Sequence, residues 1–194
     1  MVGETSKYEE HIHSLAVYQE LLEQHKAFNL SRLIEENLRP NLTGDTLIGD
    51  DKINYRGNGI FFIDDAFLQE YDDIDEVKDG ESNFLVTFFH LGSKLSGHNG
   101  IVHGGLLATL LDELTCRLAF QNFHSKKGVT ANLNINYKKP CFVNSVVMIK
   151  CELSRKSGRK CWVKGSVFSV KDSELELLTE CECLVIEPRW VKNL

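Results

Sequence analysis

The longest amphipathic pattern in the chain runs from His98 to Phe123 and predicts a helix that begins near Gly104. One broad arc of this helix is apolar, which indicates burial, whereas the opposite arc has small side chains and a single carboxylate, Asp112. Glu113 and Arg117 fall between the arcs at i,i+4 spacing and are expected at a solvent-exposed edge. The apolar arc contains Leu107, Leu110, Leu111, Leu114 and Leu118. The small-sided arc contains Gly105, Ala108, Thr109, Asp112, Cys116 and Ala119.

Other apolar patterns have the composition and period of β-strands. Residues 129–137 alternate between apolar and polar side chains, which predicts that Val129 and Leu133 share one face and Thr130 lies on the other. A strand, a long helix and four antiparallel strands in this order favour a single sheet curled around one apolar helix. Residues 154–160 are expected to form a hairpin tip. The predicted strands are residues 82–92, 129–137, 145–153, 161–170 and 178–187.

The N-terminal third has a different pattern. Residues 7–38 are amphipathic at helical spacing, and residues 41–59 carry turn signals that predict loops. Residues 59–63 could be a first strand or a short buried segment, and the acidic stretch 64–81 is expected to be a solvated loop or a short helix. The histidines of the helical region are interpreted as surface residues rather than ligands. They are His11, His13 and His25.

The chain therefore divides into an N-terminal helical arm with a loop, residues 1–58, and a main domain, residues 59–194. Its 194 residues are enough for one sizeable core. A net charge of −6 argues against a general nucleic-acid binder, and no apolar run is long enough to cross a membrane, so stable membrane insertion is not expected.

Cysteine usage indicates the compartment. None of the six cysteines forms a CxxC pair, and no histidine lies at metal-ligand spacing to them. Reduced core thiols in an intracellular protein are the preferred interpretation, and no metal site or cofactor is predicted. The N-terminus has neither a secretory pattern nor a transit pattern, so cytoplasm and mitochondrion both stay open.

A histidine and two glycines open the long helix. This turn exposes the first backbone N–H groups at the positive end of the helix dipole, where an anion or a developing oxyanion can bind. The alternative is that Gly104 and Gly105 only let the helix pass close to a sheet. The carboxylate of Asp112, two turns later, favours a functional site.

The sequence HGG followed by ATLLD, with GVTANLNINYKKP downstream, resembles the hotdog-fold acyl-CoA thioesterases. The nearest branch is the PaaI/THEM-type group, and the resemblance covers roughly residues 82–187. It implies an α+β hotdog fold, in which an antiparallel sheet wraps around a long central helix, here with an N-terminal helical extension. It also implies hydrolysis of an acyl-CoA to a free acid and CoA.

The resemblance assigns roles to individual residues. The Gly104 amide would polarise the thioester carbonyl, and Asp112 would act as general base or as nucleophile. Thr130 would help to place the water, although an ordinary strand residue is the alternative. His103 would orient the turn or the acyl group, and Gly105 is a candidate substrate-binding residue.

Two further features concern substrate binding. Related enzymes often carry an asparagine six residues before the histidine of the turn; here that position is Gly97, and Asn99 is the candidate substitute. A basic hairpin could hold the phosphates of CoA, with a solubilising hairpin tip as the alternative. Its candidate residues are Arg155, Lys156, Arg159 and Lys160.

Helix geometry predicts the assembly. Gly104 and Asp112 are eight residues apart, which is about 12 Å along a helix axis. Reacting atoms must lie within about 3.5 Å of catalytic groups, so one thioester cannot meet both residues of one chain. If both are catalytic, the site is shared across a two-fold axis, which predicts a homodimer or a dimer of dimers. The alternative functions are a non-catalytic dimer that binds acyl-CoA or a protein partner, and a hotdog hydratase or dehydratase.

Overall fold

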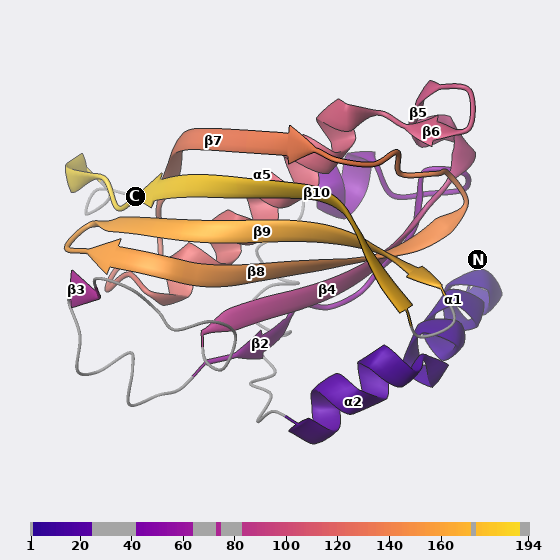
Figure 1. Ribbon diagram of the computed structural model, residues 1–194, viewed down its shortest axis with the longest axis horizontal. Helices are drawn as coiled ribbons and strands as arrows, with labels where there is room; N and C mark the ends of the chain where they lie inside the picture. The colour runs from indigo at the N-terminus through magenta and orange to yellow at the C-terminus, as the bar shows by residue number, and fades with distance from the viewer. Residues whose placement is uncertain (1, 25–41, 64–72, 75–82, 172–173, 191–194) are drawn as a thin grey trace.

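The computed structural model describes residues 2–24, 42–63, 73–74, 83–171 and 174–190. Its main feature is one antiparallel sheet with the strand order β1-β4-β8-β9-β10-β7, in which β2 also pairs with β4 and β3 with β8 (Figure 1). The strands are β1 Ile53–Arg56, β2 Ile60–Phe62, β3 Asp73–Ile74, β4 Phe84–Leu91, β7 Val129–Tyr137, β8 Ser145–Ser157, β9 Lys160–Lys171 and β10 Glu174–Ile186.

The helix α5, Gly104–Gln121, lies along the inner face of this sheet (Figure 1). All five leucines of its predicted apolar arc are buried, and they pack against inward-facing residues such as Val147, Ile149 and Val163. A short hairpin of β5, Ser96–His98, and β6, Ile101–Val102, comes just before the helix. A sheet wrapped around one apolar helix is the hotdog fold, so the predicted fold is confirmed.

Two N-terminal helices, α1 Val2–Ser14 and α2 Ala16–Gln24, form the predicted helical extension. They pack on the outer face of the sheet, where Ile12 is buried and the Tyr18 ring lies edge-on to Phe88. The outer face is therefore also apolar over most of β4 and over residues 146–149 of β8. No helix in the described part of the chain is both long and apolar enough to span a membrane.

Several predicted elements are corrected. Residues 41–59 are not all loop, because Leu42–Thr46 form a π-helix and Ile53–Arg56 form β1, which pairs with β4. The predicted hairpin tip 154–160 shrinks to a turn at residues 158–159, because β8 and β9 pair as far as Ser157 and Lys160. Residues 59–63 contain the short strand β2. The predictions for residues 25–38 and most of 64–81 lie outside the described residues. The domain boundary between residues 58 and 59 stays a prediction.

The expected exposed edge of α5 is also wrong. The Glu113 carboxylate binds Arg117 and, at 2.5 Å, Arg56 of β1, and both arginine side chains are only 10% exposed. The hydroxyl of Thr43, on the π-helix, donates to the second carboxylate oxygen of Glu113. This cluster ties β1 and the preceding segment to the helix. On the small-sided arc, Ala119 is likewise buried rather than exposed.

Candidate active site

The N-terminus of α5 has one uncapped amide. His103 is the N-cap residue, in an extended conformation (φ −61°, ψ 128°), and its Nδ1 accepts a hydrogen bond from the Gly105 N–H at 2.9 Å. The Leu106 N–H donates to the His103 carbonyl. Among the described residues, the Gly104 N–H has no acceptor. The cap therefore leaves the Gly104 amide open at the positive end of the dipole.

Tyr137, the last residue of β7, holds this turn from the side. Its hydroxyl donates to the Gly104 carbonyl at 2.8 Å, and a methyl group added to Gly104 would lie 3.3 Å from its ring. Glycine is therefore favoured at position 104 by the close approach of an aromatic ring. Sequence reasoning did not assign Tyr137 to the site. The sequence feature that could have identified Tyr137 is its position at the opposite end of the predicted strand from Thr130.

Asp112 meets the other end of β7. The Thr130 hydroxyl donates to Asp112 Oδ1 at 2.6 Å and lies 3.0 Å from the Cys116 sulfur. The second carboxylate oxygen, Oδ2, has no hydrogen-bond partner in the described part of the chain. Both side chains are at least partly exposed, so this oxygen is accessible to water or to a bound molecule.

A β-bulge brings Thr130 to the helix. Leu184 and Val185 are adjacent on β10, yet they pair with Asn132 and Thr130, so Ala131 is an extra residue on β7. The bulge shifts the side-chain alternation by one, and a one-residue shift moves a side chain to the opposite face. Leu133, which packs on the core, and Thr130 consequently both face α5. The predicted clean alternation over 129–137 is therefore wrong.

Two of the thiols near this site, Cys116 and Cys181, are poor nucleophiles. The Cys116 thiol donates a hydrogen bond to Cys183, and this bond, followed by burial, raises the pKa of Cys116. Burial likewise raises the pKa of Cys181 to about 12. A thiol attacks as its thiolate, so Cys116 and Cys181 are inactive at neutral pH. The hydrogen bond from Cys116 lowers the pKa of Cys183, but Cys183 is buried. All six cysteines are free and five are buried, which confirms that most of them are core residues.

The hairpin before α5 leaves no room for an asparagine at position 97, six residues before His103. Gly97 lies against His103, and a methyl group added there would come within 2.8 Å of the imidazole and 3.1 Å of the His103 Cα. An asparagine at position 97 would therefore displace the N-cap residue. Asn99 lies in the exposed turn between β5 and β6, followed by Gly100 at φ +75°. The structure thus places Asn99 at the tip of the hairpin.

The four basic residues of the β8–β9 hairpin lie in different surroundings. Arg155 stacks on Trp162 with its guanidinium carbon 4.6 Å from the ring centre, whereas Lys156, the next residue, is 6% exposed. Arg159 donates to the Glu187 carbonyl, and Lys160 is exposed. The four cations therefore do not converge on one point. In the described residues, no group of three or more histidine, cysteine or acidic side chains is placed to hold a metal.

The site residues form two groups at opposite ends of β7. His103, Gly104, Gly105 and Tyr137 lie at one end, and Asp112, Thr130 and Cys116 lie at the other. Strand β7 is an edge of the sheet: β10 is its only partner among the described strands, and most of its side chains are exposed. The helix face between the two groups, including Ala108 and Thr109, is also partly exposed.

Comparison with known proteins shows that these residues lie in or next to a segment that matches a known family. The model of the thioesterase superfamily matches residues 99–176. A mitochondrial protein of Candida albicans, itself uncharacterised, is 37% identical over 145 residues, which are 72% of this chain and 62% of that protein. An uncharacterised Schizosaccharomyces pombe protein is 33% identical, over 67% of this chain and 71% of its own length. The mouse acyl-coenzyme A thioesterase THEM4 is 39% identical, over 53% of this chain and 42% of its own length.

Proposed function

Because this chain belongs to the thioesterase superfamily, we propose that it hydrolyses acyl-CoA thioesters to a free acid and CoA. The proposal rests on two groups of α5. Among the described residues, the Gly104 N–H has no acceptor and the Asp112 Oδ2 has no hydrogen-bond partner. The similarity to mouse THEM4, named an acyl-coenzyme A thioesterase, supports the substrate class. The chain spans about three-fifths of the Candida protein's length and two-fifths of THEM4's, so these relatives contain further sequence.

The proposed reaction uses water as the nucleophile. Asp112 accepts a proton from a water molecule while the oxygen of that water forms a bond to the thioester carbonyl carbon. The carbonyl oxygen becomes an oxyanion and is stabilised by the Gly104 N–H and the helix dipole. The C–S bond then breaks, the acid is released, and the CoA sulfur takes up the proton from Asp112. Direct attack by the carboxylate, followed by hydrolysis of an anhydride, is the alternative route.

The two groups act together only if two chains combine. Gly104 and Asp112 lie about 12 Å apart along α5, which exceeds the reach of one reacting centre. The unpaired edge of β7 and the small-sided face of α5 offer a surface for a second copy of the chain. We infer that two-fold pairing there brings Gly104 of one protomer to Asp112 of its partner. Further association into a dimer of dimers is compatible with this arrangement.

A mixed dimer is expected to regain activity from two inactive chains. Gly104→Pro replaces the amide hydrogen with the proline ring and is compatible with the backbone, because proline suits the first helical position and His103 already has the extended conformation that precedes proline. Gly104→Ala is the matched control, since it adds a Cβ against Tyr137 and keeps the N–H. A purified heterodimer of Gly104→Pro and Asp112→Asn chains contains one intact site, so about half of the wild-type kcat is expected. An inactive heterodimer would contradict the shared site.

The activity itself is tested by measuring thiol release from acetyl-, octanoyl- and palmitoyl-CoA. Turnover well above the background of Asp112→Asn is expected with at least one chain length. A non-catalytic acyl-CoA-binding dimer is the second candidate, favoured by Gly97 where related enzymes have an asparagine. Tight binding of acyl-CoA by a protein that hydrolyses none of the three would establish that candidate and reject the enzyme.

Two finer proposals complete this function. Lys160 and Arg159 at the β8–β9 turn would contribute to binding of the CoA phosphates, because Lys160 is exposed there. The relative from Candida albicans is named a mitochondrial protein, which supports a mitochondrial location for this chain. The location can be checked by fractionation of cells that express the tagged full-length protein.

A further inference from the structure

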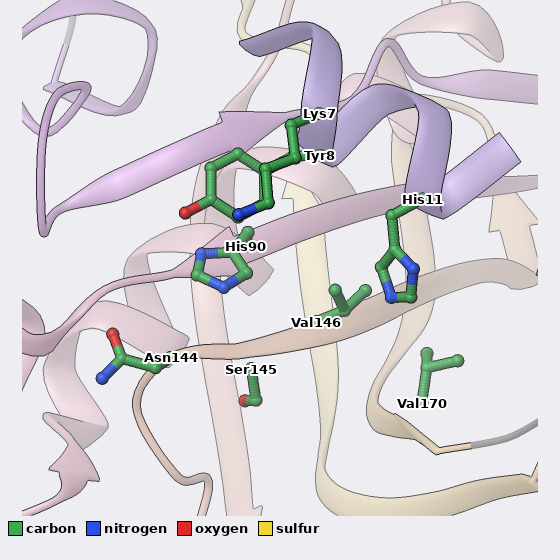
Figure 2. A pocket seen from close by; sticks show the side chains of 8 residues that line it. All are labelled: Lys7, Tyr8, His11, His90, Asn144, Ser145, Val146 and Val170. Atoms are coloured by element: carbon green, nitrogen blue, oxygen red, sulfur yellow. The ribbon is translucent and has the colours of Figure 1, made fainter. Parts of the chain in front are cut away.

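A pocket lies on the other side of the sheet from Asp112. It has a volume of about 360 Å³, is open to solvent, and lies between α1 and the outer face of β4, β8 and β9. Figure 2 shows His90 of β4 and His11 of α1 entering it from different elements, above a floor that includes Val146. None of the residues assigned to thioester hydrolysis contributes to this pocket.

His90 has its ring orientation and tautomer set by a chain of hydrogen bonds. The Asp51 backbone N–H donates to Asn54 Oδ1 at 2.8 Å, so the Asn54 amide nitrogen is the atom 2.9 Å from His90 Nδ1. Because that nitrogen is a donor, Nδ1 must accept, and the proton of the neutral ring is on Nε2. The Tyr8 ring packs on the imidazole with 4.2 Å between ring centres. The pocket therefore contains a fixed N–H donor.

The groups around this donor are cationic or hydrogen-bonding, and carboxylates are absent from the described lining residues. One edge of the His90 ring faces the amide of Asn144 and the hydroxyl of Ser145 (Figure 2). Burial, followed by the nearby charges of His11 and Lys7, lowers the pKa of His90. Among the described residues that line the pocket, Lys7 and His11 can carry positive charge and none is acidic, in a chain whose net charge is −6.

The floor of the pocket is apolar. Val146 of β8 and Val170 of β9 form it side by side on the outer face of the sheet, and Val146 is 8% exposed. A ligand that matches both parts must carry a negative group toward His90, Lys7 and His11 and an apolar group over the valines. Inorganic ions match only the first part, and neutral apolar molecules match only the second.

We propose that the pocket under α1 binds a small organic anion, a carboxylate or a phosphate monoester. Its charged oxygens accept from His90 Nε2–H and from the Lys7 ammonium. Its apolar portion lies on Val146 and Val170. The proposal is independent of thioester hydrolysis, because the pocket and Asp112 lie on opposite faces of the sheet.

The experiment is isothermal titration calorimetry of the full chain with benzoate, phenyl phosphate, inorganic phosphate and benzylammonium. Benzoate or phenyl phosphate is expected to bind with a Kd below about 10 mM, more tightly than inorganic phosphate. Benzylammonium, which has the same ring and the opposite charge, is not expected to bind. The tighter of the two aromatic anions identifies the head group.

Variants test whether binding occurs in this pocket. Replacing the exposed side chains of Lys7 and His11 by glutamine should weaken binding about tenfold with folding intact, because it removes the positive charge that attracts the anion. Lys164→Gln is the matched control, since Lys164 is an exposed cation on the same outer face and does not line the pocket. Equal weakening by the control, binding of benzylammonium, or no anion binding below about 10 mM would overturn the proposal. A ligand-induced shift of the His90 imidazole signals in NMR spectra checks the site without mutation.

Discussion

Asp112→Asn is expected to lower kcat for acyl-CoA hydrolysis by about three orders of magnitude and to leave KM within a few fold. Asparagine has nearly the same shape, and its Oδ1 can still accept from the Thr130 hydroxyl, so the local geometry is kept. What is lost is the ability of Oδ2 to take a proton from water or to attack the thioester carbon. Steady-state release of CoA thiol, measured at saturating substrate, reports the change directly.

Two control variants separate chemistry from structure. Thr130→Val removes the hydrogen bond to Asp112 and keeps the carboxylate, so a loss of about tenfold is expected. Asp51→Asn changes an exposed carboxylate in a distant turn and should leave kcat unaltered. If Asp112→Asn retained more than about a third of the wild-type kcat, Asp112 could be neither the base nor the nucleophile.

Glu113→Gln is expected to lower the free energy of unfolding by about 3–5 kcal/mol, because it leaves two buried guanidinium groups without their anion. The carboxylate binds Arg56 and Arg117, whose side chains are each 10% exposed. Burial, followed by the charge of Arg56, lowers the pKa of Arg117 to about 10, whereas Glu113 favours its charged form. The measurement is urea unfolding, with the midpoint shifted and the slope unchanged.

The matched control is Glu176→Gln, which breaks an ion pair with Lys139 in which both side chains are about half exposed. Exposed pairs contribute little, so a change within about 1 kcal/mol is expected. A Glu113→Gln variant no less stable than Glu176→Gln would show that the buried cluster contributes nothing. Because Glu113 adjoins Asp112 on α5, thiol release by the folded variant should also be measured.

Periodicity was sufficient for the elements that have a strong local pattern. The central helix begins at Gly104 as expected, and β4, β7, β8, β9 and β10 all overlap predicted strands, although β8 ends four residues later and β10 begins four residues earlier than predicted. Strand β1 was missed because four residues, Ile53–Arg56, lie among turn signals and become a strand only by pairing with β4. Local patterns do not contain such long-range pairing.

The errors at the site have the same origin. Glu113 and Arg117 looked like an exposed i,i+4 pair because their burial depends on Arg56 and Thr43, which are 57 and 70 residues from Glu113 in the sequence. The sequence pattern does not predict the bulge at Ala131, because the composition of the strand is the same with or without a bulge. Asp112 and Gly104 could be identified because their positions follow from helix geometry and from the family resemblance. Their roles in catalysis stay predictions.

The layer formed by α1 and α2 has a consequence for mutational tolerance. An antiparallel sheet ordinarily has one permissive face, on which polar substitutions cost little. Over most of β4 and the first half of β8 this protein has none, because Val86 and Met148 are as inaccessible beneath the N-terminal helices as Leu85 and Ile149 are beneath α5. Random mutagenesis of residues 84–89 and 146–149 should therefore yield few viable clones, whereas substitutions of the partly exposed Lys150 and Glu152 should be tolerated.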